Sequence, residues 1–177
     1  HTWTAESKII RSTWETAWST IGLCNTLIHD LENIDIAEIG ITEARRMSYI
    51  SEIRTLRAWA YYNCFELWGG AIPLYVSTDG VIPGSADVDF QKGCEKVYSF
   101  ICTELDESFA YLSKEDGSNA TRNRMNQAVN RMIKMRMLLN SEVFTGVARF
   151  DECAELAQAL LDGDYGTYQL ANDYRDI

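Results

Sequence analysis

Residues 52–75, EIRTLRAWAYYNCFELWGGAIPLY, decide the fold of this chain. Apolar residues recur in them at the three- and four-residue steps of an amphipathic helix, and aromatic residues widen the apolar stripe. The glycine pair at 69–70 ends the helix because glycine reaches left-handed backbone angles at little cost, and Pro73 prevents its resumption. We therefore predict a helix over residues 42–68, capped by Thr42 and packed against neighbours on more than one side.

The aromatic residues of this stretch could form a binding surface, a catalytic pocket or the packing face of a helical array. At helical spacing, Trp59, Tyr61 and Tyr62 are expected to pack, since aromatic side chains dominate ordinary cores. Trp3 lies outside the first predicted helix and Tyr75 lies in a loop, so both are freer to face a ligand. Trp3 and Tyr75 are therefore the candidate ligand-binding residues.

The helical period continues through most of the chain. It predicts further helices at about 10–31, 90–113, 127–146 and 150–162. The whole sequence holds only two prolines, which is typical of a protein with long helices. We predict an all-α fold of about five helices, with a long irregular loop near residues 69–89.

The last two predicted helices form a pair of about the size of one helix-turn-helix repeat. The sequence TGVAR, at 145–149, connects them, and the small residues Ala128, Ala154 and Ala157 would let the two helix backbones approach closely. This pattern predicts a tetratricopeptide-like helical hairpin.

Composition limits the classes of partner. The 177 residues are 46% apolar and 24% charged, which fits one globular unit. The net charge of −10 leaves no basic stripe for phosphate groups, so nucleic acid and anionic membrane surfaces are poor partners. The longest apolar runs are far shorter than the roughly 20 residues needed to cross a bilayer.

The residues that usually carry chemistry are scarce. Five cysteines form no CxxC pair and occur in helical patterns, which is typical of buried free thiols. His1 and His29 are the only histidines, so we predict no zinc site and no catalytic histidine arrangement. The sequence DGDYG at 162–166 starts like a calcium loop, but no Glu closes it. We predict no catalytic residues, no metal and no cofactor.

Three segments, in this order, resemble the SusD (SusD/RagB) family, the surface glycan-binding lipoproteins of Bacteroidetes. Residues 52–75 are similar to its Glu-x-Arg-x-Leu-Arg-Ala helix with an aromatic-Gly end and a Pro-Leu. Residues 97–112, VYSFICTELDESFAYL, are similar to the helix that follows, and residues 123–177 to its hairpin and closing tyrosine-rich stretch. Asn123 stands where the family has a glycine, and asparagine is the next most tolerant residue of a left-handed backbone angle.

The resemblance implies the rest of the interpretation. It implies that residues 1–177 are a single helical segment, the first, tetratricopeptide-like part of a longer chain. Family members are non-catalytic, bind oligosaccharides and polysaccharides, and act as a lid over a SusC-like TonB-dependent outer-membrane transporter. A lipidated cysteine that is not represented here would anchor the protein on the outer membrane, facing the outside. Most of the sugar-binding site is expected outside this chain.

Two other functions are weighed against this one. A helical array can bind another protein with no sugar involved, so a protein-interaction module is the main alternative. A glycoside hydrolase is disfavoured, because no pair of carboxylates in the sequence is singled out for acid–base work.

Overall fold

The computed structural model describes residues 4, 6–81, 89–118, 120–121 and 123–168. Within these residues the chain forms α-helices and one 3-10 turn, and no strand. The elements are α1 (Lys8–Asn33), α2 (Ile36–Ile39), α3 (Glu43–Trp68), η1 (Gly69–Ala71), α4 (Phe90–Phe109), α5 (Gln127–Leu139), α6 (Ser141–Thr145) and α7 (Phe150–Leu161). The predicted all-α fold is confirmed, with five longer helices and two short ones in the described part.

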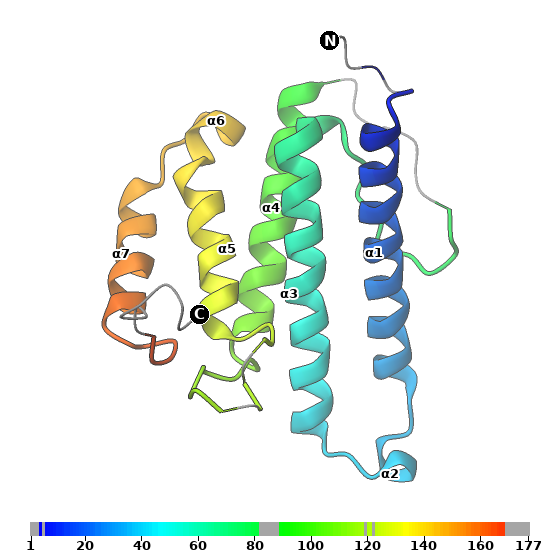
Figure 1. Cartoon of the computed structure of the whole chain (residues 1–177), viewed down its shortest axis with the longest axis vertical. Coiled ribbons are helices and arrows are strands. Elements are labelled where there is room, and N and C mark those ends of the chain that lie inside the picture. The colour runs from blue at the N-terminus through cyan, green and yellow to red at the C-terminus, as the bar shows by residue number, and fades with distance from the viewer. Residues whose placement is uncertain (1–3, 5, 82–88, 119, 122, 169–177) are drawn as a thin grey trace.

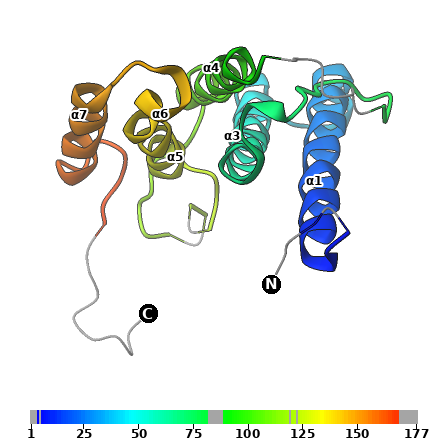
Figure 2. The same ribbon diagram turned by 90° about the horizontal axis from the view of Figure 1, so that it is seen from above.

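The longer helices follow one another across the molecule in chain order, from α1 at one side to α7 at the other (Figures 1 and 2). Helix α3 packs against α1 on one side and α4 on the other, and α7 packs against α5. The predicted helix with neighbours on more than one side is therefore α3. None of the described helices is both long enough and apolar enough to cross a membrane.

The core lies around the second half of α3. Tyr61 and Phe65 are almost wholly inaccessible to solvent, and Tyr61 meets the ring edges of Trp18 and Phe100. Aromatic packing is thus confirmed for Tyr61. Trp59 differs from the prediction, because 46% of its surface is exposed on the side of α3 that neither α1 nor α4 covers.

The end of α3 and the start of α4 approach at backbone distance. A Cβ atom placed on Gly93 would lie 2.1 Å from the carbonyl oxygen of Gly70, and one on Gly70 would lie 2.3 Å from the amide nitrogen of Cys94. Any residue with a Cβ atom would clash at these distances, so both positions require glycine. The glycine pair therefore ends α3 and also makes room for the next long helix.

Helix caps follow the sequence closely. The Thr42 hydroxyl accepts a hydrogen bond from the amide of Arg45 at 3.2 Å, and Asn126 caps α5 in the same way through the amide of Val129. The expected helix at 127–146 is interrupted at Asn140, whose side-chain amide donates to the carbonyl of Arg136 at 3.1 Å. The backbone of Asn140 leaves helical values, with φ −98° and ψ 9°, and α6 starts after the break.

The α5–α7 pair is the predicted helical hairpin. The Cys153 thiol of α7 donates to the carbonyl of Met135 on α5 at 3.4 Å. No residue of α7 is fully buried in the described structure. Helix α7 therefore keeps exposed apolar surface, with Leu161 81% exposed.

Candidate functional site

Two arginines of the 52–75 stretch converge on one carboxylate of α4. The Arg57 Nε donates to Glu104 Oε2 at 2.8 Å, and the Arg54 Nε donates to Glu104 Oε1 at 2.9 Å. Arg57 is 7% exposed and Glu104 is 4% exposed, so these charges are held in the protein interior. The paired arginines therefore join α3 to α4, with Arg57 buried and Arg54 partly exposed.

The same network extends to α1 and to the loop after α3. The Arg57 Nη1 donates to the side-chain oxygen of Asn25 at 2.9 Å. The side-chain amide of Asn25 in turn donates to the carbonyls of Tyr75 and Ser77, at 3.0 Å each. One buried asparagine thus ties the loop to the helix array.

Tyr75, a candidate ligand-binding residue, lies in this network. Its backbone is held by the Tyr61 hydroxyl, which donates to the Tyr75 carbonyl at 2.9 Å and accepts from the Tyr75 amide at 2.7 Å. Its own hydroxyl accepts from the amide of Gly80 at 2.8 Å, and only 5% of the residue is exposed. The expectation of a free loop side chain is therefore wrong, because the loop folds onto the core at this point. Contact of Tyr75 with a glycan stays a prediction, and Trp3 lies outside the described residues.

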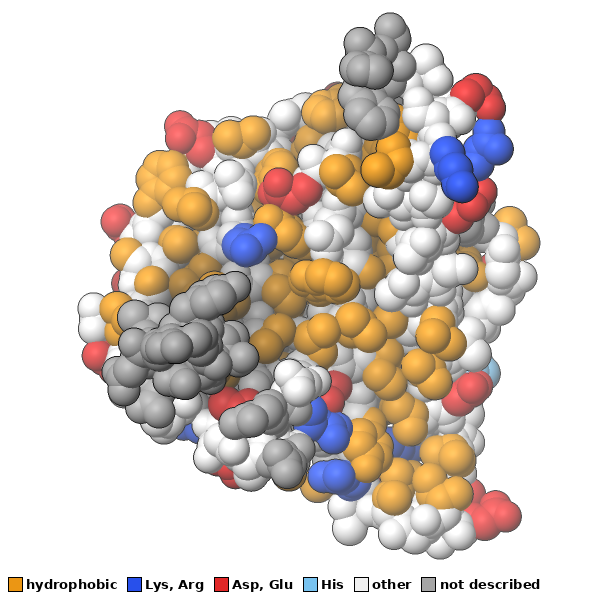
Figure 3. Space-filling view, viewed as in Figure 1, with side chains coloured by type: hydrophobic (Ala, Val, Ile, Leu, Met, Phe, Trp, Pro, Cys, Tyr) orange, Lys and Arg blue, Asp and Glu red, His pale blue; other side chains and the backbone are white. Residues whose placement is uncertain are grey.

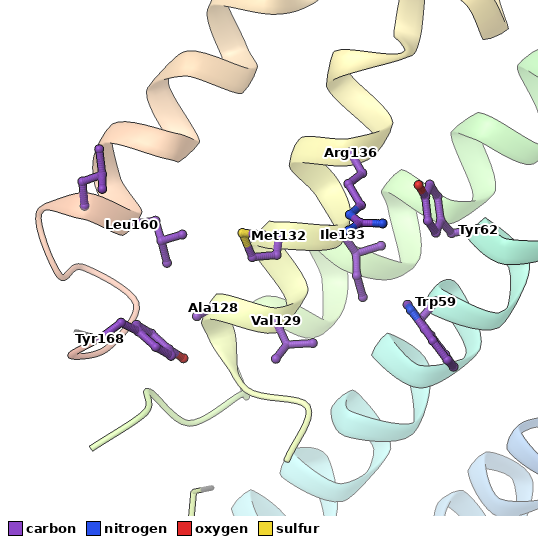
Figure 4. Close-up of a pocket in the computed structure, with 10 residues that line it drawn as sticks. Trp59, Tyr62, Ala128, Val129, Met132, Ile133, Arg136, Leu160 and Tyr168 are labelled. Atoms are coloured by element: carbon purple, nitrogen blue, oxygen red, sulfur yellow. The ribbon is translucent and has the colours of Figure 1, made fainter. Parts of the chain in front are cut away.

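A groove of about 720 Å³ opens on the face of the molecule shown in Figures 3 and 4. We call it the α3–α5–α7 groove. It is lined by Trp59, Tyr62, Ala128, Val129, Met132, Ile133, Arg136, Leu160, Leu161 and Tyr168. Apolar side chains make up most of this lining, and they continue across the neighbouring surface in Figure 3. The groove is a feature of the described surface that could receive a partner.

The walls of the groove come from three helices and the segment after α7. Figure 4 shows Trp59 and Tyr62 of α3 on one side, Met132 and Ile133 of α5 at the floor, and Tyr168 on the far side. Exposure is high at its rim, at 46% for Trp59 and 52% for Tyr168. The rim of the groove is thus open to solvent at these two residues.

One charged group faces this apolar lining. The Arg136 guanidinium lies over the ring of Tyr62, with its central carbon 6.0 Å from the ring centroid. Among the described residues, no carboxylate forms an ion pair with Arg136. A guanidinium in this position can donate hydrogen bonds to a carbonyl, a carboxylate or a hydroxyl of an occupant.

The structure offers little chemistry beyond binding. Burial raises the pKa of the Cys24, Cys64 and Cys102 thiols to about 11, so these thiols stay protonated and are weak nucleophiles at neutral pH. All five cysteines are free, as the sequence predicts. Within the described part of the chain, no three His, Cys, Asp or Glu side chains gather as metal ligands would.

Sequence reasoning missed the groove. Leu160-Leu161, two adjacent apolar residues at the end of α7, indicate apolar side chains on two sides of that helix, but they do not locate a groove. Trp59 lies on the wide apolar stripe of α3, which predicts packing on more than one side and therefore a buried side chain. Which side of α3 stays open depends on where α5 lies, and that is a tertiary property.

No protein-family model matches the chain. The chain is 28% identical over 138 residues to the starch-binding protein SusD of Bacteroides thetaiotaomicron, a match that covers 78% of this chain and 23% of that protein. Among solved structures, a laminarin binding SusD-like protein has a TM-score of 0.69 at 18% identity, covering 94% of this chain and 34% of its own. A structure with xylogluco-oligosaccharide has a TM-score of 0.74 at 20% identity, covering 98% of this chain and 33% of its own.

The predicted resemblance to the SusD family is therefore confirmed, in sequence by the first match and in fold by the solved structures. The chain spans about a quarter of the length of its curated relative and about a third of the solved chains. The regular elements of the matched part are all helices within its described residues, which fits the tetratricopeptide-like interpretation.

Proposed function

We propose that this chain is the helical segment of a longer SusD-like protein that captures oligosaccharides or polysaccharides at the cell surface without catalysis. The observation that carries the proposal is the SusD-like fold over nearly the whole chain, shared with a laminarin binding protein and with a structure that holds a xyloglucan oligosaccharide. The sequence match to a starch-binding protein supports the same class of ligand. The captured glycan is delivered to a SusC-like TonB-dependent outer-membrane transporter, and a lipid anchor holds the protein on the outer membrane.

Within that protein, the segment serves as a scaffold. Its most polar interior group, the Arg57–Glu104 pair, joins helices and has no opening to solvent. Tyr75 acts by fixing the loop after α3, and Trp3 is the candidate for direct sugar contact. Most sugar contacts are made by residues outside this chain.

A protein-interaction module without a sugar ligand is the second candidate. The observation that favours it is the α3–α5–α7 groove, whose apolar lining fits a polypeptide better than a sugar. Sugar sites combine an aromatic platform with several hydrogen-bonding groups. The polar groups of this groove are Arg136, the Trp59 indole N–H and the hydroxyls of Tyr62 and Tyr168, and its other six lining residues are aliphatic or carry a thioether.

Polysaccharide-retardation electrophoresis tests the proposal. The longer protein and the 177-residue chain are run side by side in gels that contain starch, laminarin or xyloglucan, with plant, host and microbial glycans as further lanes. We expect at least one polysaccharide to retard the longer protein and none to retard the short chain. If no polysaccharide slows either protein, the interaction-module function replaces glycan capture.

Co-purification tests the transporter. The longer protein, extracted from outer membranes with mild detergent, is expected to bring a TonB-dependent transporter with it. Recovery of the protein alone, under conditions that keep other outer-membrane complexes intact, would remove the transporter from the proposal and leave glycan binding in place.

A further inference from the structure

We propose that Asn130 of α5 is a register lock, a buried amide that fixes where α5 lies along α3 and α4. Its partners in the lock are Thr55 of α3 and Ser108 of α4. The lock thereby sets the place of the α5–α7 hairpin in the molecule. This inference goes beyond the proposed function and does not depend on it, because it concerns only how the helices of this chain are held together.

The lock joins three helices at one buried point. The side-chain nitrogen of Asn130 lies 3.2 Å from the Thr55 hydroxyl, 3.1 Å from the Ser108 hydroxyl and 3.0 Å from the carbonyl of Leu105. The two hydroxyls lie 3.2 Å apart, and Ser108 also donates to the carbonyl of Glu104 at 2.7 Å. Thr55, Ser108 and Asn130 are each 0% exposed. Three polar side chains, each from a different helix, therefore meet in the interior.

The apolar contacts of α5 specify its position poorly. Its buried apolar side chains include Met135 and Met137. Methionine is unbranched and flexible, so it fills irregular spaces and tolerates more than one packing arrangement. Hydrophobic contact is also non-directional. A helix whose inner face carries two methionines therefore needs another feature to select one position along its neighbours.

The Asn130 hydrogen bonds supply that selection, because a hydrogen bond is lost when its heavy atoms move beyond about 3.5 Å. A slide of α5 by one residue moves its side chains about 1.5 Å along the helix axis. Such a slide would break contacts of 3.0–3.2 Å, whereas the methionine side chains could adapt to it. The amide is therefore satisfied in one register only.

Stability alone does not account for this amide. Among the described residues, its Oδ1 has no hydrogen-bond partner. A buried acceptor without a partner costs free energy, and a leucine of similar shape would carry no such cost. Asn130 thus specifies position at the expense of stability, which is the best-attested role of a buried polar residue among apolar ones.

The position of α5 has consequences for α7. Helix α7 packs against α5, and the Cys153 thiol donates to the carbonyl of Met135 at 3.4 Å. A shift of α5 would therefore carry the hairpin with it. The α3–α5–α7 groove has walls on both sides of the lock, so its shape depends on the lock as well.

NMR of the longer protein, with isotope-labelled methionine methyl groups, tests the lock in the Asn130→Leu variant. This change leaves the Thr55 and Ser108 hydroxyls bonded to each other. Because cores lose uniqueness before they lose stability, we expect the melting temperature to stay within about 3 °C of the unsubstituted protein. We also expect the Met135 and Met137 methyl signals to split, or to broaden at least about twofold, as α5 samples more than one position.

Two controls accompany this test. The methyl signal of Met47, on α3, should stay single and sharp. Ile133→Val, which removes one methyl group from a buried apolar residue of α5, should move the Met135 and Met137 signals and leave each of them single. Each signal is assigned by the loss that follows its replacement by leucine.

The outcomes decide the proposal. Single, sharp Met135 and Met137 signals in Asn130→Leu overturn it. A lower melting temperature with all signals broadened, Met47 included, gives Asn130 an ordinary stabilising role and also overturns it. If Asn130→Leu does not fold, the same readout is made on the variant that combines Thr55→Val with Ser108→Ala, which removes both side-chain partners of the amide.

Discussion

At Arg57, a guanidinium that is 7% exposed is satisfied by Glu104 on one helix and by Asn25 on another. A charge in the interior costs free energy unless it is paired and hydrogen-bonded, and here both conditions hold. The arrangement therefore fixes how α1, α3 and α4 meet, which a purely apolar contact would fix less specifically.

Removal of one partner should be costly. We expect Arg57→Ala to lower the free energy of unfolding by about 3–5 kcal/mol, because the Glu104 carboxylate would lose a charge-assisted partner in the interior. Arg149→Ala is the matched control: its pair with Glu152 has side chains 43% and 52% exposed, and such a pair is worth about 0–1 kcal/mol. Urea titration measures both values, and equal losses for the two variants would contradict the account of the buried network.

Two glycines within helices should respond oppositely to alanine. A methyl group on Gly93 would press on the Gly70 carbonyl, so Gly93→Ala is expected to destabilise the protein by about 1–3 kcal/mol or more. Gly22, inside α1, has no other atom within 4 Å of an added Cβ. Gly22→Ala should therefore stabilise by about 0.5–1 kcal/mol through helix propensity alone. A stabilising Gly93→Ala, measured by thermal unfolding, would show that α3 and α4 do not meet at backbone distance.

Some of these residue-level features were readable in the sequence. Asn123 has a φ of 62°, in the left-handed region that its place in the family pattern predicts. The role of Tyr75 was not readable, because its burial depends on contacts with Asn25 and Tyr61, which precede it by 50 and 14 residues and which no helical period connects to it.

At the scale of elements, the loop between α4 and α5 holds a cluster of polar side chains. Hydrogen bonds from Ser118 and from the Thr121 hydroxyl lower the pKa of Asp116 to about 2. A carboxyl group whose pKa is lower in the folded state contributes stability above its unfolded pKa and loses it as the pH falls toward the folded value.

This loop should therefore contribute to acid sensitivity. Between about pH 4 and pH 2, protonation of Asp116 weakens the loop, so the melting temperature should fall with decreasing pH. Asp116→Asn should show a lower melting temperature at neutral pH and a shallower fall over the same range. Parallel curves for the two proteins, followed by circular dichroism, would mean that the Asp116 hydrogen bonds add nothing to stability.

Element boundaries were predictable where one residue decides them. Thr42, the glycine pair at 69–70 and Asn126 begin or end helices through local hydrogen bonds and backbone angles, and the structure agrees at each of them. The break at Asn140 was missed, since an asparagine within an apolar helical pattern is read as an exposed position. Its backbone angles instead leave the helical region.

At the scale of the whole molecule, the open groove makes the 177-residue chain a poor unit on its own. We expect it to self-associate or to unfold at modest temperature, while the longer protein stays monomeric, because exposed apolar surface drives association. Light scattering behind a size-exclusion column measures this, and Leu161→Glu should reduce the association. A monomeric chain with a sharp melting transition that does not depend on concentration would contradict the expectation.

The groove itself could not be predicted from the sequence. Its walls come from residues about 100 positions apart, such as Trp59 and Leu161, and their spacing depends on how α5 and α7 pack. The sequence indicates the helices and their hairpin. Which apolar face stays open depends on how all of these helices pack together.

The central claim is tested most directly by hydrogen–deuterium exchange of the longer protein, with and without an oligosaccharide. The oligosaccharide is taken from the polysaccharide that retards the protein most in electrophoresis. If the protein captures a glycan and this chain is its scaffold, glycan-dependent protection falls mainly outside residues 1–177. Helices α3 and α4 and the groove then exchange at the same rate in both states. If the strongest glycan-dependent protection appears within the α3–α5–α7 groove, or if no peptide of the protein responds to any glycan, that claim is contradicted.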